Sequence, residues 1–290
     1  MGTFDGVHIG HAAILKKLTQ NTADGKFESA VLTFFPHPRM VLQGKSDLKL
    51  LNTINEKIDL LEKIGIENLI IHPFDANFSQ LSAEEFVKTV LVDQLHIQKI
   101  IIGYDHRFGK NRTANIDDLT AFGLKYGFEV EQISAQEIND ISISSTKIRT
   151  ALEDGEINLA NEYLGYSYFL SGTVVKGKQL GRTIGFPTAN IELEEEYKLV
   201  PKNGVYIVAA EIDGKSVYGM MNIGFNPTVQ GEKRTIEVHF FDFDLDIYDR
   251  HIRVAILQHI RSEEKFESVE FLKIQLGKDK DFSIQYIQNL

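Results

Sequence analysis

The chain has 290 residues, 43% of them hydrophobic and 25% charged, which is typical of a globular protein and enough for two domains of the usual size, roughly 150 residues each. It contains no cysteine, which excludes a disulfide framework, a thiolate zinc site, an iron–sulfur cluster and a cysteine nucleophile. The formal net charge of −10, the lack of a long apolar run and the absence of a signal-peptide pattern predict a cytoplasmic protein with no nucleic-acid or membrane partner.

The first half of the chain, residues 1–164, alternates strand and helix patterns. Three short apolar runs are typical of buried strands: residues 29–35, 69–72 and 99–103. Helical spacing of apolar residues marks the segments between and after them: residues 54–64, 86–91, 146–152 and 157–164. A capping box formed by Ser82 and Glu85 begins one of these helices, and Gly165 ends the last. This alternation predicts parallel strands with crossover helices, a doubly wound α/β domain.

The second half, residues 165–290, changes to short β-rich runs bounded by Gly, Pro and Asn. The runs are residues 169–175, 204–212, 216–223, 235–240 and 251–260. The pair Asp213-Gly214 lies between two runs and is a strong hairpin signal. Five or six such strands predict a small antiparallel β-barrel. Helical spacing over residues 266–276, before Gly277, predicts a C-terminal helix.

The chain opens with GTFDGVHIGH at residues 2–11, followed by an amphipathic helical pattern. A helix start suits a triphosphate because its free N–H groups and partial positive charge attract anions. Gly10 permits close backbone approach, and His8 and His11 can donate hydrogen bonds to phosphate oxygens as charge develops. The alternative for an isolated H-x-x-H is a pair of ordinary helix-terminal histidines or a chance metal pair. The ten-residue context favours the phosphate site.

A second phosphate element is predicted at residues 143–149, with the sequence ISSTKIR. Hydroxyl and basic side chains gather at this helix start: Ser144, Ser145, Thr146, Lys147 and Arg149. Alone, the pattern is typical of a well-capped helix. Because it closes the same α/β domain that begins with the two histidines, we expect it to bind the phosphates from the opposite side.

These two elements resemble the nucleotidyltransferase family with an H-x-G-H signature, and the full string resembles its FMN adenylyltransferase (FAD synthetase) branch. The segments FFPHP at residues 34–38 and GYDHRFGK at residues 103–110 fit the same branch. The resemblance implies a Rossmann-like fold and an ATP site that includes Gly2, Phe4 and Asp5. It also implies that the flavin is bound by Pro36, His37, Pro38, Asp105 and Phe108. His106 departs from the Phe more usual in the family.

The family motif follows a full first strand, whereas Met1 stands where that strand should end. We therefore expect the first strand of this domain to be missing, either because the chain is shortened or because its start is misassigned. A central parallel strand supplies ladder hydrogen bonds and core, so its loss would weaken adenylyl transfer.

A glycine-rich loop in the second half predicts a different phosphate site. Its glycines are Gly177, Gly181 and Gly185, and their backbone can wrap phosphates although no Walker A ending follows. Arg182 supplies local positive charge, and Thr188 and Asn190 offer oxygen ligands suited to Mg²⁺. The alternative is a glycine-rich barrel turn with an Asn cap.

Glu237 lies in an otherwise apolar alternating strand. A carboxylate there is either an edge charge or a functional base. Phosphoryl transfer to a hydroxyl needs one carboxylate to orient and deprotonate the nucleophile, and we assign that role to Glu237.

The strings GRTIGFPTAN at residues 181–190, NGVY at 203–206 and EVHFFDF at 237–243 resemble the riboflavin kinase (flavokinase) family, along the whole second half. The resemblance implies that Thr188 and Asn190 bind Mg²⁺ with ATP and that Glu237 is the base on the ribityl 5′-hydroxyl. It also places Arg261 and Glu264 where the family closes a flap near the flavin.

Together the halves resemble prokaryotic FAD synthetases, which convert riboflavin to FMN and FMN to FAD with ATP and Mg²⁺. Two alternatives remain: a riboflavin kinase whose adenylyltransferase half is impaired, and a flavin-binding module without catalysis. The presence of Glu237 argues against the second, because a pure binder needs no base. A reading as an aminoacyl-tRNA synthetase fails on length, on the missing lysine–serine signature loop and on the net charge of −10.

Overall fold

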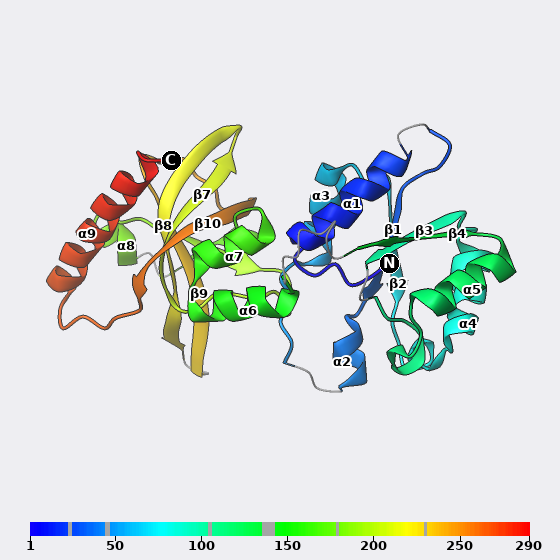
Figure 1. Ribbon diagram of the computed structural model, residues 1–290. Coiled ribbons are helices and arrows are strands. Elements are labelled where there is room, and N and C mark those ends of the chain that lie inside the picture. The colour runs from blue at the N-terminus through cyan, green and yellow to red at the C-terminus, as the bar shows by residue number, and fades with distance from the viewer. Residues whose placement is uncertain (23–24, 44–46, 104–105, 135–142, 178–179, 229–230) are drawn as a thin grey trace. The chain divides into compact units, whose positions relative to one another are not determined.

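The computed structural model describes residues 1–22, 25–43, 47–103, 106–134, 143–177, 180–228 and 231–290. It divides into two compact units, Met1–Ser144 and Ser145–Leu290, each of which is described by itself (Figure 1). Helices α6 (Ser145–Asp154) and α7 (Ile157–Leu164) are grouped with the second unit by their contacts. The expected boundary between the functional domains, after residue 164, stays a prediction.

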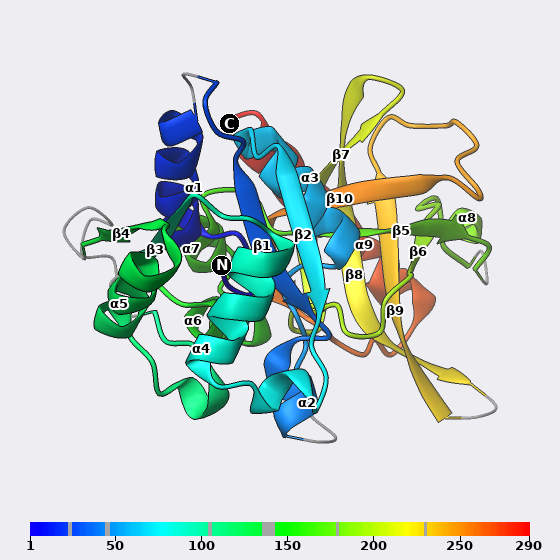
Figure 2. The same ribbon diagram turned by 90° about the vertical axis from the view of Figure 1, so that its right-hand side faces the viewer.

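The first unit contains parallel strands, as the sequence predicts. β1 (Ala30–Phe35) pairs with β2 (Asn68–Pro73), and β3 (Lys99–Gly103) pairs with β4 (Glu129–Ile133) (Figure 2). The described strands form these two separate pairs. The expectation that a further first strand is missing stays a prediction.

Four helices of the first unit, α2 to α5, begin with a side-chain cap. Their bounds are α1 (Ile9–Thr22), α2 (Pro38–Leu42), α3 (Ile54–Ile64), α4 (Ala83–Phe86), which continues as the π-helical segment Val87–Gln94, and α5 (Ile116–Tyr126). The predicted capping box of Ser82 and Glu85 is confirmed, and Thr53 begins α3 in the same way. Short 3₁₀ turns lie at Phe78–Gln80 and Lys110–Arg112.

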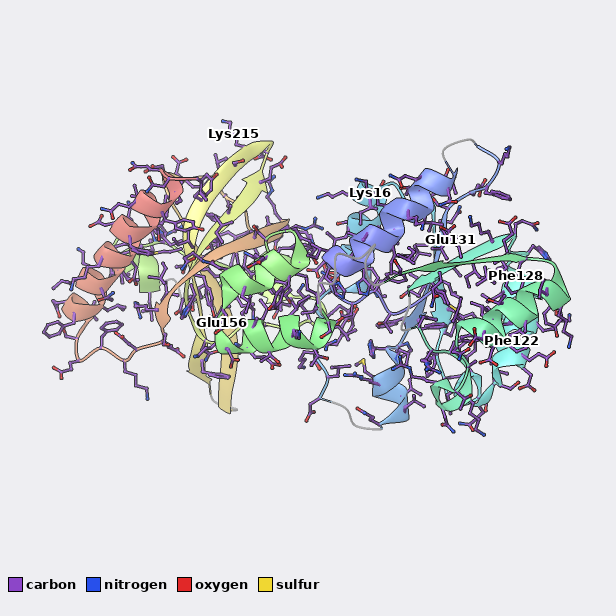
Figure 3. All side chains as sticks on the ribbon, viewed as in Figure 1. Lys16, Phe122, Phe128, Glu131, Glu156 and Lys215 are labelled. Carbon is purple, nitrogen blue, oxygen red and sulfur yellow. The ribbon has the colours of Figure 1, made fainter. Side chains whose placement is uncertain are left out.

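The core of the first unit joins the strands to the helices. Leu32 of β1 and Ile102 of β3 belong to one buried cluster, together with residues of the α4 region. Phe122 on α5 packs against this cluster, and Phe128, just before β4, is part of it (Figure 3). Burial of these apolar side chains fixes the strand ends that carry the candidate site.

The second unit is a closed antiparallel barrel, which confirms the predicted architecture. Its strands are β5 (Phe169–Val175), β6 (Ala189–Leu193), β7 (Gly204–Ile212), β8 (Lys215–Thr228), β9 (Gly231–Phe240) and β10 (His251–Ser262). They are hydrogen-bonded in the order β10-β5-β6-β9-β8-β7, and the ring then closes from β7 back to β10 (Figure 2). Asp213 and Gly214 both have positive φ at the β7–β8 turn, as a two-residue hairpin requires.

The C-terminal helix α9 (Val269–Ile287) confirms the predicted element but is longer than predicted. Ser268 caps its start, and the helix continues through Gly277 instead of ending there. A Cβ at Gly277 would meet no atom within 4 Å, so the glycine is a tolerated interior residue and not a helix end. Within the described ranges, no helix has both the length and the apolar character needed to cross a membrane.

Candidate functional site

We call residues 2–11 the histidine segment. It begins beside β1 and ends in the first turn of α1. The Gly2 N–H donates to the Leu32 carbonyl at 2.9 Å. Phe4 (φ 46°) and Val7 (φ 39°) adopt left-handed backbone that is unfavourable for side chains of their size. Such strain persists only where surrounding contacts fix the backbone, and it is concentrated at functional sites.

The structure brings the two predicted histidines together at a helix start. His8 immediately precedes α1, and its ring stacks on that of His11 with centroids 3.7 Å apart. The His11 N–H donates to His8 Nδ1 at 3.4 Å, and the Phe4 ring lies 5.1 Å from the His11 ring. Gly10 lies between them in the first turn, where the backbone N–H groups of a helix have no intrahelical acceptor.

Burial favours the neutral form of both histidines. Burial lowers the pKa of His8 to about 4, against an opposing effect of the Asp5 carboxylate. Burial also holds the pKa of His11 well below its usual range, and His8 and Lys57 lower it further. A neutral imidazole has one N–H, so each ring can donate one hydrogen bond to a phosphate oxygen.

Asp5, predicted to bind ATP, is 2% exposed. Its Oδ1 accepts from the backbone N–H groups of Leu51, at 2.9 Å, and Asn52, at 3.4 Å. These bonds attach the histidine segment to the loop before α3. Lys57 of α3 also contacts the segment, and sequence reasoning missed it because a lysine in an amphipathic helix is usually solvated.

The predicted second phosphate element lies at the start of α6. Ser144 precedes the helix, Ser145 and Thr146 are its first residues, and Arg149 is buried at 7% exposure. Because α6 is grouped with the second unit, the pairing of these residues with His8 and His11 stays a prediction.

Of the predicted flavin residues, Pro36, His37 and Pro38 follow the carboxyl end of β1 and Phe108 follows that of β3, the ends at which ligands bind in open α/β sheets. Pro36 follows a cis peptide bond, and Pro38 begins α2. His37 caps α2, because its Nδ1 accepts the Arg39 N–H at 3.1 Å. Phe108 is buried and forms a bridge with Ala114. Asp105 lies outside the described residues.

An aromatic cluster that the sequence did not reveal lies beside this edge. The ring centroid of Phe34 on β1 lies 5.8 Å from that of Phe74 and 5.6 Å from that of Phe78. The ring centroid of His72 on β2 lies 4.4 Å from that of Phe78. All four side chains are partly exposed. A partly exposed aromatic surface can bind a flat ring, and it was missed because parallel pairing of β1 and β2 creates it.

In the second unit, the predicted metal ligands and base lie together. Asn190 on β6 and Glu237 on β9 are register partners, and Asn222 on β8 is the partner of Glu237 on the other side. The Thr188 hydroxyl donates to Glu237 Oε2 at 3.4 Å. Thr188 and Asn190, two residues apart, are therefore brought to Glu237 from a distant strand, and the structure adds Asn222 to this cluster.

The glycine-rich loop packs tightly against this cluster. A Cβ at Gly177 would lie 2.2 Å from Asn190 Nδ2, and one at Gly181 would lie 2.2 Å from the Phe186 carbonyl. Gly185 has φ 88°, and the neighbouring Arg182 on helix α8 (Leu180–Thr183) is exposed. The glycines are therefore required by close approach and by backbone conformation.

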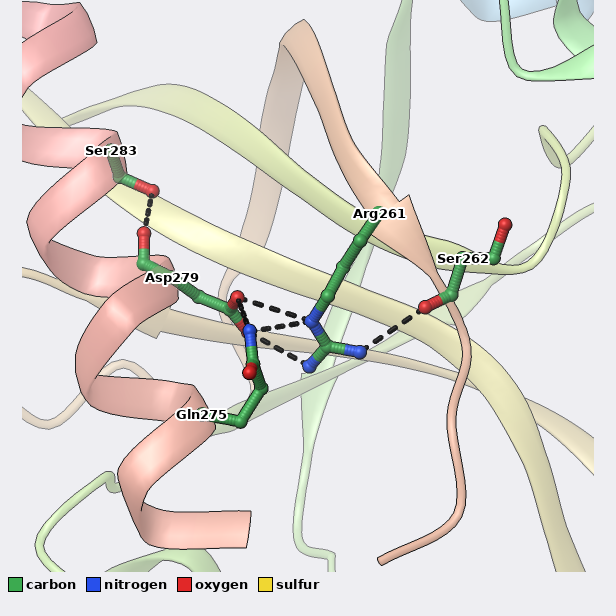
Figure 4. Close-up of polar contacts among 5 residues, drawn as sticks. All are labelled: Arg261, Ser262, Gln275, Asp279 and Ser283. Carbon is green, nitrogen blue, oxygen red and sulfur yellow. Dashed lines mark hydrogen bonds and ion pairs between the residues drawn. The ribbon is translucent and has the colours of Figure 1, made fainter. Parts of the chain in front are cut away.

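Arg261, predicted to lie near the flavin, is bound to the C-terminal helix (Figure 4). Its Nη2 lies 2.8 Å from Asp279 Oδ2, and Gln275 donates to Asp279 Oδ1 at 2.8 Å. Glu264 is exposed. The adjacent Glu263 accepts a hydrogen bond from Asn203 Nδ2 at 3.2 Å, a contact that sequence reasoning missed.

Comparison with known proteins covers both units. A family model described as FAD synthetase matches residues 1–147, and one described as riboflavin kinase matches residues 164–287. A protein of Listeria monocytogenes named bifunctional riboflavin kinase/FMN adenylyltransferase is 40% identical over 282 residues, covering 97% of this chain and 89% of the relative. The Bacillus subtilis protein of that name is 39% identical over 298 residues, covering 100% and 92%.

A solved structure also matches nearly the whole chain. A protein of Streptococcus pneumoniae described as a macrolide-efflux protein superposes with a TM-score of 0.87 and 32% identity, covering 98% of this chain and 92% of that one. The two family models match one unit each for most of its length, and the named relatives cover nearly the whole chain. The chain belongs to the family of bifunctional riboflavin kinase/FMN adenylyltransferases.

Proposed function

We propose that this chain makes FAD from riboflavin in two ATP-dependent steps. The second unit phosphorylates riboflavin to FMN, and the first unit transfers AMP from a second ATP to FMN and releases pyrophosphate. The observation that carries the proposal is that each unit holds its own constellation: stacked His8 and His11 at the start of α1, and Thr188, Asn190 and Glu237 on neighbouring barrel strands.

In the kinase step, Glu237 accepts the proton of the ribityl 5′-hydroxyl while that oxygen attacks the γ-phosphorus of ATP, and ADP leaves. The Thr188 hydroxyl contacts the same carboxylate, which fixes its position. Hydroxyl, amide and carboxylate oxygens are the donors that Mg²⁺ prefers, so Thr188 and Asn190 fit a magnesium site shared with the ATP phosphates. Mg²⁺ bound there would neutralise charge on the transferred phosphoryl group.

In the adenylyl step, a phosphate oxygen of FMN attacks the α-phosphorus of ATP, and pyrophosphate leaves. The nucleophile is already anionic, so the step needs no general base. This agrees with two histidines whose pKa values are lowered by burial and which act as neutral donors. The hydroxyls and Arg149 at the start of α6 supply the further donors and positive charge.

ATP, riboflavin, FMN and FAD are thus the substrates and products. Both steps consume ATP, so we place the enzyme in the cytoplasm. The net charge of −10 supports the absence of a nucleic-acid partner.

The test is a product chromatogram of the purified chain with riboflavin, ATP and Mg²⁺, in which fluorescence distinguishes riboflavin, FMN and FAD. We expect FAD. Glu237→Ala should abolish FMN formation but still convert supplied FMN, whereas replacing His8 and His11 with Ala should stop the reaction at FMN. Glu211→Ala and His96→Ala, which change exposed residues of the same units, should make FAD.

The remaining outcomes separate the alternatives. FMN alone from the unmodified chain would support a kinase with an impaired first unit. No conversion by a folded sample would support a flavin-binding module.

A further inference from the structure

Lys57 is a buried cation that the proposed mechanism does not use. It lies on α3, and only 5% of its surface is exposed. Its Nζ donates to the Thr3 carbonyl at 2.8 Å and to the Thr33 hydroxyl at 3.4 Å. Thr3 belongs to the histidine segment, so α3 reaches this segment through a charged group.

Lys57 binds the backbone immediately before a strained residue. The Thr3 carbonyl that it binds belongs to the residue before Phe4, which has φ 46°. The Thr33 hydroxyl donates to the same carbonyl at 3.2 Å. Two donors therefore converge on one carbonyl and fix the point from which the left-handed turn begins.

Hydrogen bonding alone does not require a charge at this place. A neutral amide could donate to the Thr3 carbonyl, whereas burial of an ammonium carries a desolvation penalty. The Asp5 carboxylate offsets part of that cost, since it favours the charged form of Lys57 against burial, which lowers the pKa. An anionic ligand on the histidine segment would offset more, because Lys57 is close enough to affect the ionisation of His11.

We propose that Lys57 is a positioning residue for adenylyl transfer: its ammonium fixes the Thr3 carbonyl and supplies positive charge beside the histidine segment, which favours a bound triphosphate. The inference rests on the proposed function, in which this segment binds the ATP phosphates. Lys57 acts through the backbone that it holds and through its field, without contacting the reacting atoms.

The experiment compares Lys57→Gln, which keeps a donor and removes the charge, with Lys57→Arg, which keeps the charge. Lys63→Gln changes an exposed lysine of the same helix and is the matched control. The full chain is assayed for FAD formation from FMN at varied ATP, and for riboflavin phosphorylation as an internal reference. Hydrogen exchange of residues 1–144, with and without ATP, reports folding and ligand stabilisation of the first unit.

We expect Lys57→Gln to lower kcat of FMN adenylylation about tenfold or more, with a smaller rise in KM for ATP, because charge develops further in the transition state. Phosphorylation of riboflavin should stay within about twofold of the unmodified chain, and ATP should protect the first unit less. Lys57→Arg should recover most of kcat, and Lys63→Gln should change neither activity.

Two results would overturn the inference while leaving the proposed function intact. One is a Lys57→Gln chain with kcat within about twofold of the unmodified chain, which would mean that the charge is not used. The other is loss of exchange protection over residues 1–144 in both Lys57 variants, which would assign Lys57 to folding. If the unmodified chain converts no FMN to FAD, the proposed function itself fails.

Discussion

Arg261 at the end of β10 and Asp279 on α9 form a bidentate ion pair, with Nε 3.1 Å from both carboxylate oxygens and Nη2 2.8 Å from Oδ2 (Figure 4). The Asp279 side chain is 2% exposed and that of Arg261 is 16% exposed. Gln275 adds a further hydrogen bond to the same carboxylate. The C-terminal helix is therefore attached to the last barrel strand by a desolvated, oriented contact.

We expect Asp279→Ala to destabilise the second unit by about 3 kcal/mol, because it leaves the Arg261 guanidinium largely buried without its anion. Hydrogen exchange or urea unfolding followed on residues 145–290 measures the effect. The pair Arg250–Asp213 is the control, since both of its side chains are about half exposed. Arg250→Ala should leave the midpoint almost unchanged, and an equal loss in the two variants would contradict the role of burial.

The first unit should lose stability in mild acid. Burial lowers the pKa of His8 to about 4 and that of His106 to about 3, from an ordinary value of 6.5. Such a histidine takes up its proton on unfolding, so its contribution is complete above pH 6.5 and is lost as the pH falls toward the folded-state value. The loss approaches about 1.4 kcal/mol per pH unit for each histidine.

Urea unfolding of the full chain, followed on residues 1–144 between pH 7 and pH 5, measures how the free energy of unfolding of the first unit changes with pH. His106→Phe should make the slope shallower, because one proton-binding group is removed. Leu124→Ala, at an exposed position that carries no titratable group, should not change it. An unchanged slope in His106→Phe would show that His106 does not bind a proton on unfolding.

Gly177→Ala should impair the kinase step alone. The new methyl group would lie 2.2 Å from Asn190 Nδ2, so the Asn190 side chain must leave its present position. We expect roughly tenfold slower FMN formation and a shifted Mg²⁺ titration, since displaced ligands reduce positioning. Adenylylation of supplied FMN should be unchanged, and a normal Mg²⁺ titration would remove Asn190 from the predicted ligand set.

Gly277→Ala should stabilise the second unit. The glycine lies inside α9, and a Cβ there would meet no atom within 4 Å. Alanine lowers the conformational entropy of the unfolded chain, which is worth about 0.5–1 kcal/mol in a helix interior. The urea midpoint of residues 145–290 should rise without a change in riboflavin phosphorylation, and a lower midpoint would show hidden strain at this position.

The elements that could be predicted carry their own local pattern. Strands β1 and β3 are continuous apolar runs, and the Asp213-Gly214 turn is fixed by its residue types. Strand β4 was missed because its sequence, EVEQI, is mostly polar. Glu131 in that strand is satisfied by Lys17 at 2.8 Å and Lys99 at 2.7 Å, contacts that form only after folding.

The candidate site was predictable to the same extent. The motif residues form two pairs, His8 with His11 and Thr188 with Asn190. The members of each pair are neighbours in the sequence and lie together in the structure. Lys57 could not be predicted, because its partner Thr3 is 54 residues away and a lone lysine carries no motif. Long-range contacts of charged residues depend on the assembled core, which sequence spacing does not report.

The closed ring of the barrel bears on how this protein is made. Strand β5 is the first barrel strand to leave the ribosome, and it pairs with β10, the last, through Thr173 and His251. Until β10 emerges, the nascent chain must keep two unpaired strand edges, which are surfaces that other chains can join. The second unit therefore completes its ring only after residues 251–262 have been made, and chaperones that shield strand edges would have most effect on this half of the chain.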